Sequence, residues 1–239
     1  MKIAIRGGHN YGVPGASGII DELTEDRKYY KEVMKYLQQA GHQVLDVTPE
    51  RTSTQNEDLA YGVSRANQWG ADLFISCHLN AGGGHGCEVW YCNKGKDYAA
   101  KISSAISSLG FTNRGAKQSS NLYELNKTTM AAVIVEPLFV DTQSDVDLYT
   151  RVGISALGLK IAEAVNGRNI AAAPAYPGYA LRYGTKGDNN VKLVQQRLGL
   201  DIDGSFGPKT LAAVRSFQAS KGLSIDGIVG PKTWAALFN

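Results

Sequence analysis

The chain has 239 residues, enough for one or two globular domains, and its 43% hydrophobic content includes no apolar run of membrane-spanning length. Its net charge is only +3, with +4 carried by the part from Tyr179 onward and −1 by the part before it. So small a basic excess, without a recognition-helix signature, argues against a nucleic-acid-binding protein. We therefore expect neither a membrane nor a nucleic acid as partner, and the sequence leaves the oligomeric state open.

The sequence up to about residue 167 alternates apolar runs of strand length with segments of helical period. This alternation is typical of an α/β domain with a mostly parallel sheet flanked by helices. The predicted strands are Lys2–Ile5, Gln43–Val47, Asp72–His78, Glu88–Tyr91 and Ala132–Glu136. A glycine that favours a helix C-terminus lies within two residues after each predicted helix. These helices are Glu25–Ala40, Asp58–Trp69, Tyr98–Leu109 and Asp145–Val165.

Residues 168–178 contain two prolines and no amphipathic period, which predicts a linker between a first domain, residues 1–167, and a second, residues 179–239. An internal repeat occupies much of the second domain, since the segment Leu200–Thr210 returns 23 positions later as Leu223–Thr233. Each copy is a turn followed by the start of a helix, with a proline near the first helical turn. Together with a preceding helix, the repeat predicts a small all-α domain of three helices.

Two composition features concern the predicted cores. The cysteines Cys77, Cys87 and Cys92 lie in apolar, strand-like segments and are expected to be small buried side chains. Cys87 and Cys92 are five positions apart, so a regular strand directs them to opposite faces and they are not expected to share a metal ion. A second domain this small also needs most of its aromatic residues for its core rather than for binding.

Three strand-like runs end in side chains that can bind a metal ion or act beside one. His9 follows the first strand across Arg6-Gly7-Gly8, His78 ends the third strand, and Glu136 ends the fifth. In an open parallel sheet such strand ends lie along one edge, where ligands bind. Two histidines and a carboxylate gathered there indicate a zinc site.

A catalytic zinc site uses three protein ligands and keeps a fourth position open, with two histidines and one glutamate among the known sets. The third ligand is expected from the connection after the first strand, where we favour Glu22, with Glu25 and Asp21 as alternatives. A single histidine at a strand end is more often a hydrogen-bonded structural residue. Glu136 differs, because a carboxylate within the apolar run Val133–Val140 is costly to bury without a partner.

This order of residues resembles the zinc-dependent N-acetylmuramoyl-L-alanine amidases of the type 3 family, which include clostridial and bacillus phage endolysins. The resemblance rests on His9, Glu22, His78 within Ile75–Ala81, and Glu136 after Val133-Ile134-Val135. It extends to Asn113–Lys117 and Leu122–Leu125. It implies that His9, Glu22 and His78 bind zinc and that Glu136 is catalytic.

Two departures from that family surround the expected catalytic glutamate. Ala131 stands where the family often has proline, and Pro137-Leu138-Phe139 follows Glu136 where the family has Gly-Phe. The tail, in turn, resembles the peptidoglycan-binding domain 1 family, in which Asp-Gly-x-x-Gly-Pro-x-Thr closes each repeat. Here these segments are Asp203–Thr210 and Asp226–Thr233, and the resemblance implies peptidoglycan as partner.

Together the two resemblances imply a peptidoglycan hydrolase that cleaves the amide bond between N-acetylmuramic acid and L-alanine, as a phage endolysin or an autolysin. Glu136 is expected to act as general base and acid, and Arg114 and Asn80 to contact the substrate. The apolar start Met1–Ile5 is too short for the core of a signal peptide. We therefore expect a protein made in the cytoplasm that reaches the wall after release through a holin or lysis.

Two alternative functions stay open. A zinc peptidase would keep the metal and cut within the stem peptide, and a new N-terminus other than alanine in the products would reveal it. A non-catalytic wall-binding protein with a degenerate enzyme domain is the other alternative. The complete set of His9, Glu22, His78 and Glu136 argues against a degenerate site.

Overall fold

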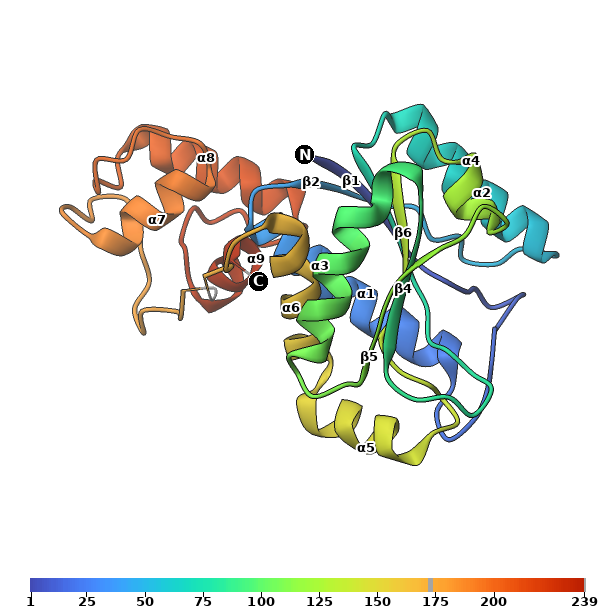
Figure 1. The fold of residues 1–239 in the computed structure, drawn as a ribbon. Coiled ribbons are helices and arrows are strands. Elements are labelled where there is room, and N and C mark those ends of the chain that lie inside the picture. Colours follow the sequence, from blue (N-terminus) through green and yellow to red (C-terminus); the bar gives the residue numbers. More distant parts are fainter. Residues whose placement is uncertain (172–173, 239) are drawn as a thin grey trace. The chain divides into compact units, whose positions relative to one another are not determined.

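The computed structural model describes residues 1–171 and 174–238, and the chain forms two compact units, Met1–Ile170 and Ala171–Asn239 (Figure 1). Residues 172 and 173 of the expected linker lie outside the described part. Within the described residues, no helix combines the length and the apolar character that crossing a membrane requires.

The first unit is built on a six-stranded sheet with the strand order β2-β1-β3-β6-β4-β5 (Figure 1). Its strands are β1 (Lys2–Gly7), β2 (Gln43–Asp46), β3 (Leu73–Cys77), β4 (Cys87–Cys92), β5 (Asn113–Gln118) and β6 (Ala131–Glu136). The first four strands in this order run parallel, β4 is antiparallel to β6, and β5 is parallel to β4. The sheet confirms the predicted α/β class, and its antiparallel pair makes it mixed.

Helices cover both faces of the sheet, because successive strand residues point to opposite sides and both sides are apolar. On one face, Ile3 and Ile5 of β1 share a core with three helices, whereas Ala4 shares a core with two helices on the other face. The first set is α1 (Glu22–Gln39), α3 (Lys96–Ser107) and α6 (Ile154–Asn166). The second set is α2 (Gln55–Trp69) and α4 (Tyr123–Lys127).

The cysteines follow this alternation of faces. All three are free and buried, and Cys87 lies in the first core while Cys92 lies in the second. The two ends of β4 therefore direct their thiols to opposite sides of the sheet, as the spacing predicted.

Several local predictions were wrong. Helix α2 begins at Gln55 rather than at Asp58, because Thr54 and Glu57 form a capping box at its start. Helix α1 begins at Glu22 rather than at Glu25, because the Asp21 side chain caps it by accepting a hydrogen bond from the Thr24 N–H at 2.8 Å. Gly153, with φ of 78°, divides the helix predicted over residues 145–165 into α5 (Gln143–Val152) and α6. Strand β5 and helix α4 were not predicted, since one is a polar edge strand and the other is only five residues long.

The second unit contains, among its described residues, the three predicted helices α7 (Asn189–Arg197), α8 (Pro208–Ser220) and α9 (Pro231–Phe238). Pro208 and Pro231 open α8 and α9, the position where a missing backbone N–H costs least. Phe206, Trp234 and Phe238 are buried in the core, whereas Tyr183 is 61% exposed. Most of the aromatic rings are therefore structural, as the size of the domain predicted.

The sequence repeat is also a structural repeat, centred on a buried glutamine in each copy. The Gln195 side-chain amide donates to Asp203 Oδ1 at 2.7 Å, to the Ser205 carbonyl at 3.0 Å and to Thr210 Oγ1 at 3.2 Å. Twenty-three positions later the same bonds recur at 2.8, 3.0 and 3.1 Å, from Gln218 to Asp226, Ile228 and Thr233. Each glutamine thus ties one Asp-Gly turn to the helix that follows it.

Candidate metal centre and active site

The strand register brings the predicted site residues to one edge of the sheet. Gly7 of β1 pairs with Cys77 of β3, and Cys77 pairs with Val135 of β6, so the carboxyl ends of these three strands lie level. His78 directly follows β3, Glu136 is the last residue of β6, and His9 lies two positions after β1. The edge therefore carries two imidazoles and a carboxylate, as the sequence predicted.

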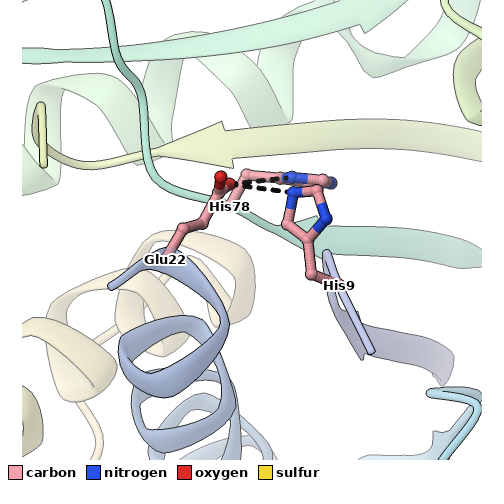
Figure 2. A group of neighbouring side chains, drawn as sticks. All are labelled: His9, Glu22 and His78. Atoms are coloured by element: carbon pink, nitrogen blue, oxygen red, sulfur yellow. Dashed lines mark hydrogen bonds and ion pairs between the residues drawn. The ribbon is translucent and has the colours of Figure 1, made fainter. Parts of the chain in front are cut away.

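Glu22 reaches the same place as the first residue of α1, and Figure 2 shows its carboxylate facing both imidazole rings. Glu22 Oε1 lies 3.1 Å from His9 Nε2 and 3.3 Å from His78 Nδ1. One nitrogen or oxygen atom of each residue lies within 4.8 Å of the other two. The structure therefore brings His9, Glu22 and His78 into a single group of potential metal ligands.

The two alternatives to Glu22 make other contacts. Asp21 caps helix α1 through Thr24, as described above. Glu25 accepts a hydrogen bond from the Tyr149 hydroxyl at 2.9 Å and forms an ion pair with Lys28 at 2.6 Å. Neither belongs to the group formed by the two histidines and Glu22.

Hydrogen bonds at the far nitrogen of each ring indicate which nitrogen faces the group. His9 Nδ1 lies 3.1 Å from the Val13 carbonyl, which can only accept, so Nδ1 carries the proton and Nε2 presents its lone pair. The Ser76 hydroxyl donates to Glu124 at 3.2 Å, so at 3.1 Å from His78 Nε2 it accepts the ring proton and leaves Nδ1 free. In the neutral rings, the nitrogens without a proton are therefore those that face Glu22, as metal ligation requires.

Glu22 is fixed from the other side by backbone N–H groups. Its Oε2 accepts from Ala16 at 2.8 Å and its Oε1 accepts from Leu79 at 3.0 Å. Burial alone would raise the pKa of Glu22, but hydrogen bonds with His78 and His9 outweigh burial and hold the pKa well below its usual value. Glu22 is therefore a carboxylate anion. Burial alone would lower the pKa of His78, but hydrogen bonds with Glu124 and Glu22 outweigh burial and raise that pKa to about 10, so its Nδ1 shares a proton with Glu22 that a bound metal ion would replace.

Two glycines allow these side chains to approach so closely. A Cβ on Gly8 would lie 2.3 Å from the ring of His78. A Cβ on Gly15, whose φ is 74°, would lie 2.6 Å from both Glu22 Oε2 and the His9 ring. The site thus fits a tetrahedral ion such as zinc in its donor types and in the space that the backbone leaves around it.

Glu136 lies beside this group without belonging to it. Its Oε2 accepts hydrogen bonds from Asn80 Nδ2 at 2.8 Å and from Trp90 Nε1 at 3.0 Å. Burial raises the pKa of Glu136 to about 7, and repulsion from Glu88, its partner in the β4–β6 register, acts in the same direction. A carboxyl group with a pKa near neutrality is able both to accept and to return a proton.

Glu88 connects the two predicted substrate-binding residues. Its Oε1 accepts from Asn80 Nδ2 at 3.2 Å, so the Asn80 amide bridges Glu88 and Glu136. Its Oε2 accepts from Arg114 Nε, and the Arg114 guanidinium also lies over the Phe139 ring, 5.0 Å from its centroid. Asn80 and Arg114 are therefore held in defined positions close to Glu136.

A pocket of about 370 Å³ opens at this edge of the sheet. The side chains that matter for the chemistry and line this pocket are His78, Asn80, Glu88, Trp90, Glu124 and Glu136. His78 of the candidate metal group and Glu136, the candidate proton-transfer group, thus border the same space.

Sequence reasoning missed Glu88, Trp90, Ser76 and Glu124. Glu88 carries the signal that singled out Glu136, because it is a carboxylate inside an apolar strand and only 4% exposed. Glu124 lies on the short helix α4, which has no hydrophobic period to reveal it. Ser76 lies within strand β3, and the sequence of that strand does not indicate which residues the Ser76 hydroxyl contacts.

Comparison with known proteins gives family matches for both units. Residues 3–166 match the family described as N-acetylmuramoyl-L-alanine amidase, and residues 187–237 match the one described as putative peptidoglycan binding domain. An uncharacterized 38.4 kDa protein of Clostridium perfringens is 47% identical over 174 residues, covering 69% of this chain and 51% of that protein. The sporulation-specific N-acetylmuramoyl-L-alanine amidase of Bacillus subtilis is 34% identical over 151 residues, covering 61% of this chain and 58% of that protein.

The chain thus spans about half the length of these relatives. Among solved structures, the catalytic domain of CD27L endolysin targeting Clostridia difficile is similar with a TM-score of 0.66 and 33% identity. That likeness covers 72% of this chain and 99% of the endolysin domain. Since the first family match spans residues 3–166, well over half of the sequence, the chain belongs to the N-acetylmuramoyl-L-alanine amidase family.

Proposed function

We propose that this protein is a zinc-dependent N-acetylmuramoyl-L-alanine amidase that hydrolyses the amide bond joining muramic acid to the L-alanine of the stem peptide. The observation that carries the proposal is the convergence of His9, Glu22 and His78, with ligand atoms within 4.8 Å of one another, beside the pocket that Glu136 lines. Membership of the amidase family supports the choice of bond.

His9 Nε2, Glu22 Oε1 and His78 Nδ1 would hold the zinc ion, which leaves the pocket side of the group for substrate and water. Bound zinc supplies Lewis acidity, which makes a water molecule more acidic and a carbonyl carbon more electrophilic. The protein contributes the fixed tautomers of the two histidines and the ionised state of Glu22.

Glu136 is the proposed proton-transfer group. As the carboxylate it takes a proton from the attacking water while the new carbon–oxygen bond forms at the lactyl carbonyl. As the carboxylic acid it then gives that proton to the alanine nitrogen when the carbon–nitrogen bond breaks. The products are a muramic acid carboxylate and a stem peptide with a free N-terminal alanine.

Arg114 is the proposed substrate contact near Glu136, and Asn80 lies between Glu136 and Glu88. The Arg114 side chain is 34% exposed, and its Nε forms an ion pair with Glu88, which itself lines the pocket. A guanidinium so placed suits a carboxylate of the stem peptide. The Asn80 amide already bridges two carboxylates, so we assign it mainly to the orientation of Glu136.

The second unit is the proposed peptidoglycan anchor. Its family match and its net charge of +4 suit an anionic wall polymer. The likeness to an endolysin catalytic domain supports a lytic role, in which the protein is made in the cytoplasm and reaches the wall after release through a holin or lysis. Peptidoglycan is then both the substrate of the first unit and the partner of the second.

Mass spectrometry of purified peptidoglycan digested by the full chain tests the proposal. We expect stem peptides that begin with free L-alanine and glycan strands that retain the lactyl carboxylate. Products with any other new N-terminus would replace the amidase by a zinc peptidase. Binding to walls without any new terminus would replace it by a non-catalytic wall-binding protein.

A further inference from the structure

A buried ionic cluster lies directly beneath the candidate metal centre. The Arg6 guanidinium forms ion pairs with Asp58 at 2.6 Å and with Glu124 at 3.1 Å, and all three side chains are at most 2% exposed. Arg6 comes from β1, Asp58 from α2 and Glu124 from α4, so the cluster joins the sheet to the two helices on one face. Charges so fully removed from water require partners on all sides.

The cluster reaches the His9 segment through two contacts. Arg6 donates to the Gly8 carbonyl at 2.8 Å, immediately before His9. Asp58 accepts from Asn10 Nδ2 at 2.6 Å, immediately after His9. The residues on both sides of His9, the Gly8 backbone and the Asn10 side chain, are therefore held by the same pair of charges.

The cluster reaches His78 through Glu124 and Ser76. Glu124 Oε2 lies 3.7 Å from His78 Nε2, and Glu124 Oε1 accepts from the Ser76 hydroxyl at 3.2 Å. Because Ser76 gives its proton to Glu124, its oxygen faces His78 Nε2 at 3.1 Å as an acceptor. In the neutral ring, which is the form that binds a metal ion, the proton of His78 is thereby kept on Nε2.

We propose that Glu124, acting through Ser76, is a positioning residue that fixes His78 with Nδ1 directed at the metal and so sets the affinity for zinc. The proposal rests on the proposed zinc site. Glu124 is not one of the three candidate metal ligands, and its most direct path to them runs through Ser76 and His78. Outer carboxylates of this kind change metal affinity or activity by about 10- to 100-fold when they are substituted.

Glu124→Gln tests this assignment, because it keeps the size of the side chain and removes the charge. Zinc dissociation constants are measured on the full chain by competition with a chromophoric chelator, below the unfolding temperature of each variant. We expect the dissociation constant to rise by about 10- to 100-fold, and hydrolysis of cell walls to return close to the wild-type rate once zinc is saturating. Rescue by zinc distinguishes a positioning role from general damage to the fold.

Glu88→Gln is the matched control. Glu88 lines the same pocket, is 4% exposed and also forms an ion pair with an arginine, but has no contact with either histidine among its hydrogen bonds and ion pairs in the described residues. We expect its zinc affinity to stay at the wild-type value. An equal loss of affinity in both variants would overturn the proposal, because the effect would then follow from the loss of any buried negative charge.

Ser76→Ala removes the hydroxyl that links Glu124 to His78 and leaves the ionic cluster intact, so it decides the matter if Glu124→Gln fails to fold. A raised zinc dissociation constant in Ser76→Ala supports the proposal. Unchanged zinc affinity in a folded Glu124→Gln or, failing that, in Ser76→Ala overturns it. A wild-type chain that binds no zinc would instead overturn the proposed function, so the two failures are distinguishable in one series.

Discussion

The two units of the chain assemble their important residues in opposite ways. In the first unit, His9 and Glu136 are 127 positions apart in sequence and meet only because three parallel strands end level. In the second unit, the glutamine network joins residues no more than 15 positions apart and then repeats. A local network is visible as a sequence repeat, whereas a site formed by distant segments becomes visible only through the topology of the sheet.

The two arrangements also differ in the charge that they bury. The first unit encloses Arg6, Asp58, Glu22 and Glu124, each at most 4% exposed, around a candidate metal centre. The second unit buries neutral groups, Gln195 and Gln218, and keeps its acidic turn residues at the surface. Substitutions in the first unit should therefore act on chemistry and metal binding, and those in the second on folding and attachment.

The largest effect is expected for Glu136→Gln, which should largely abolish hydrolysis while leaving attachment to the wall unchanged. Glu136→Gln should lower the rate of peptidoglycan hydrolysis by about 100- to 10,000-fold, because the amide cannot accept a proton from water. Zinc content and binding to intact cell walls should stay at wild-type values, since Glu136 is outside the metal group and outside the second unit. Hydrolysis assays and wall pull-down with the same preparation check both; retained hydrolysis would remove Glu136 from the mechanism.

The next effect tests whether the two repeats are equivalent. Gln195→Ala and Gln218→Ala each remove three donated hydrogen bonds and leave a buried backbone N–H, Gly204 or Gly227, without its acceptor. Each should lower the free energy of unfolding of the second unit by roughly 2–4 kcal/mol and weaken attachment to walls, with zinc content unchanged.

Gln196→Ala is the control for this pair, because Gln196 is exposed on the same helix. We expect it to change stability by no more than about 0.5 kcal/mol in chemical denaturation. Very different losses for Gln195→Ala and Gln218→Ala would show that the repeat is not energetically symmetric.

A smaller effect concerns the stability of the first unit, which the buried carboxylate of Glu136 lowers at neutral and higher pH. Burial raises the pKa of Glu136 from 4.5 to about 7, so the folded protein holds this proton more tightly than the unfolded chain does. The stability that the protonated Glu136 contributes is therefore fully present below about pH 4.5. It is lost as the pH rises from about 4.5 to 7 and above. In zinc-free protein, Glu136→Gln should be more stable than wild type by roughly 1–3 kcal/mol at pH 8 and by little at pH 4.

Denaturant unfolding of both zinc-free proteins at the two pH values measures this difference. The prediction fails if the wild type is the more stable protein at pH 8, or if the gain from Glu136→Gln is the same at pH 4. Either result would mean that Glu136 is not held in an environment that disfavours its charge.

The predictable parts of the first unit are those with a local signal. The apolar runs of β1, β3 and β6 indicated the sheet edge, and the residues at their ends indicated the metal group. The reversed direction of β4 was not predictable, because strand direction depends on long connections rather than on local pattern. The polar strand β5 lacks the hydrophobic alternation that marks a strand.

Within the site, the candidate metal ligands could be predicted, but the residues that hold them in place could not. His9, Glu22 and His78 are residue types with a recognised chemistry, and Glu136 is conspicuous in an apolar strand. Arg6 and Ser76, in contrast, carry no sequence signal of a role in the site. Their role becomes visible only in the structure, where both contact Glu124 of the short helix α4. The contacts that support the candidate ligands depend on how distant segments pack together. The spacing of residues in the sequence does not reveal them.

The most direct test of the central claim is the zinc-edge X-ray absorption spectrum of the full chain loaded with one equivalent of zinc. We expect first-shell scattering from nitrogen and oxygen only, with zinc–nitrogen distances of about 2.0–2.1 Å from two imidazoles, and loss of bound zinc in His78→Ala. A sulfur contribution near about 2.3 Å, or an unchanged spectrum in His78→Ala, would place the metal elsewhere and contradict the site formed by His9, Glu22 and His78.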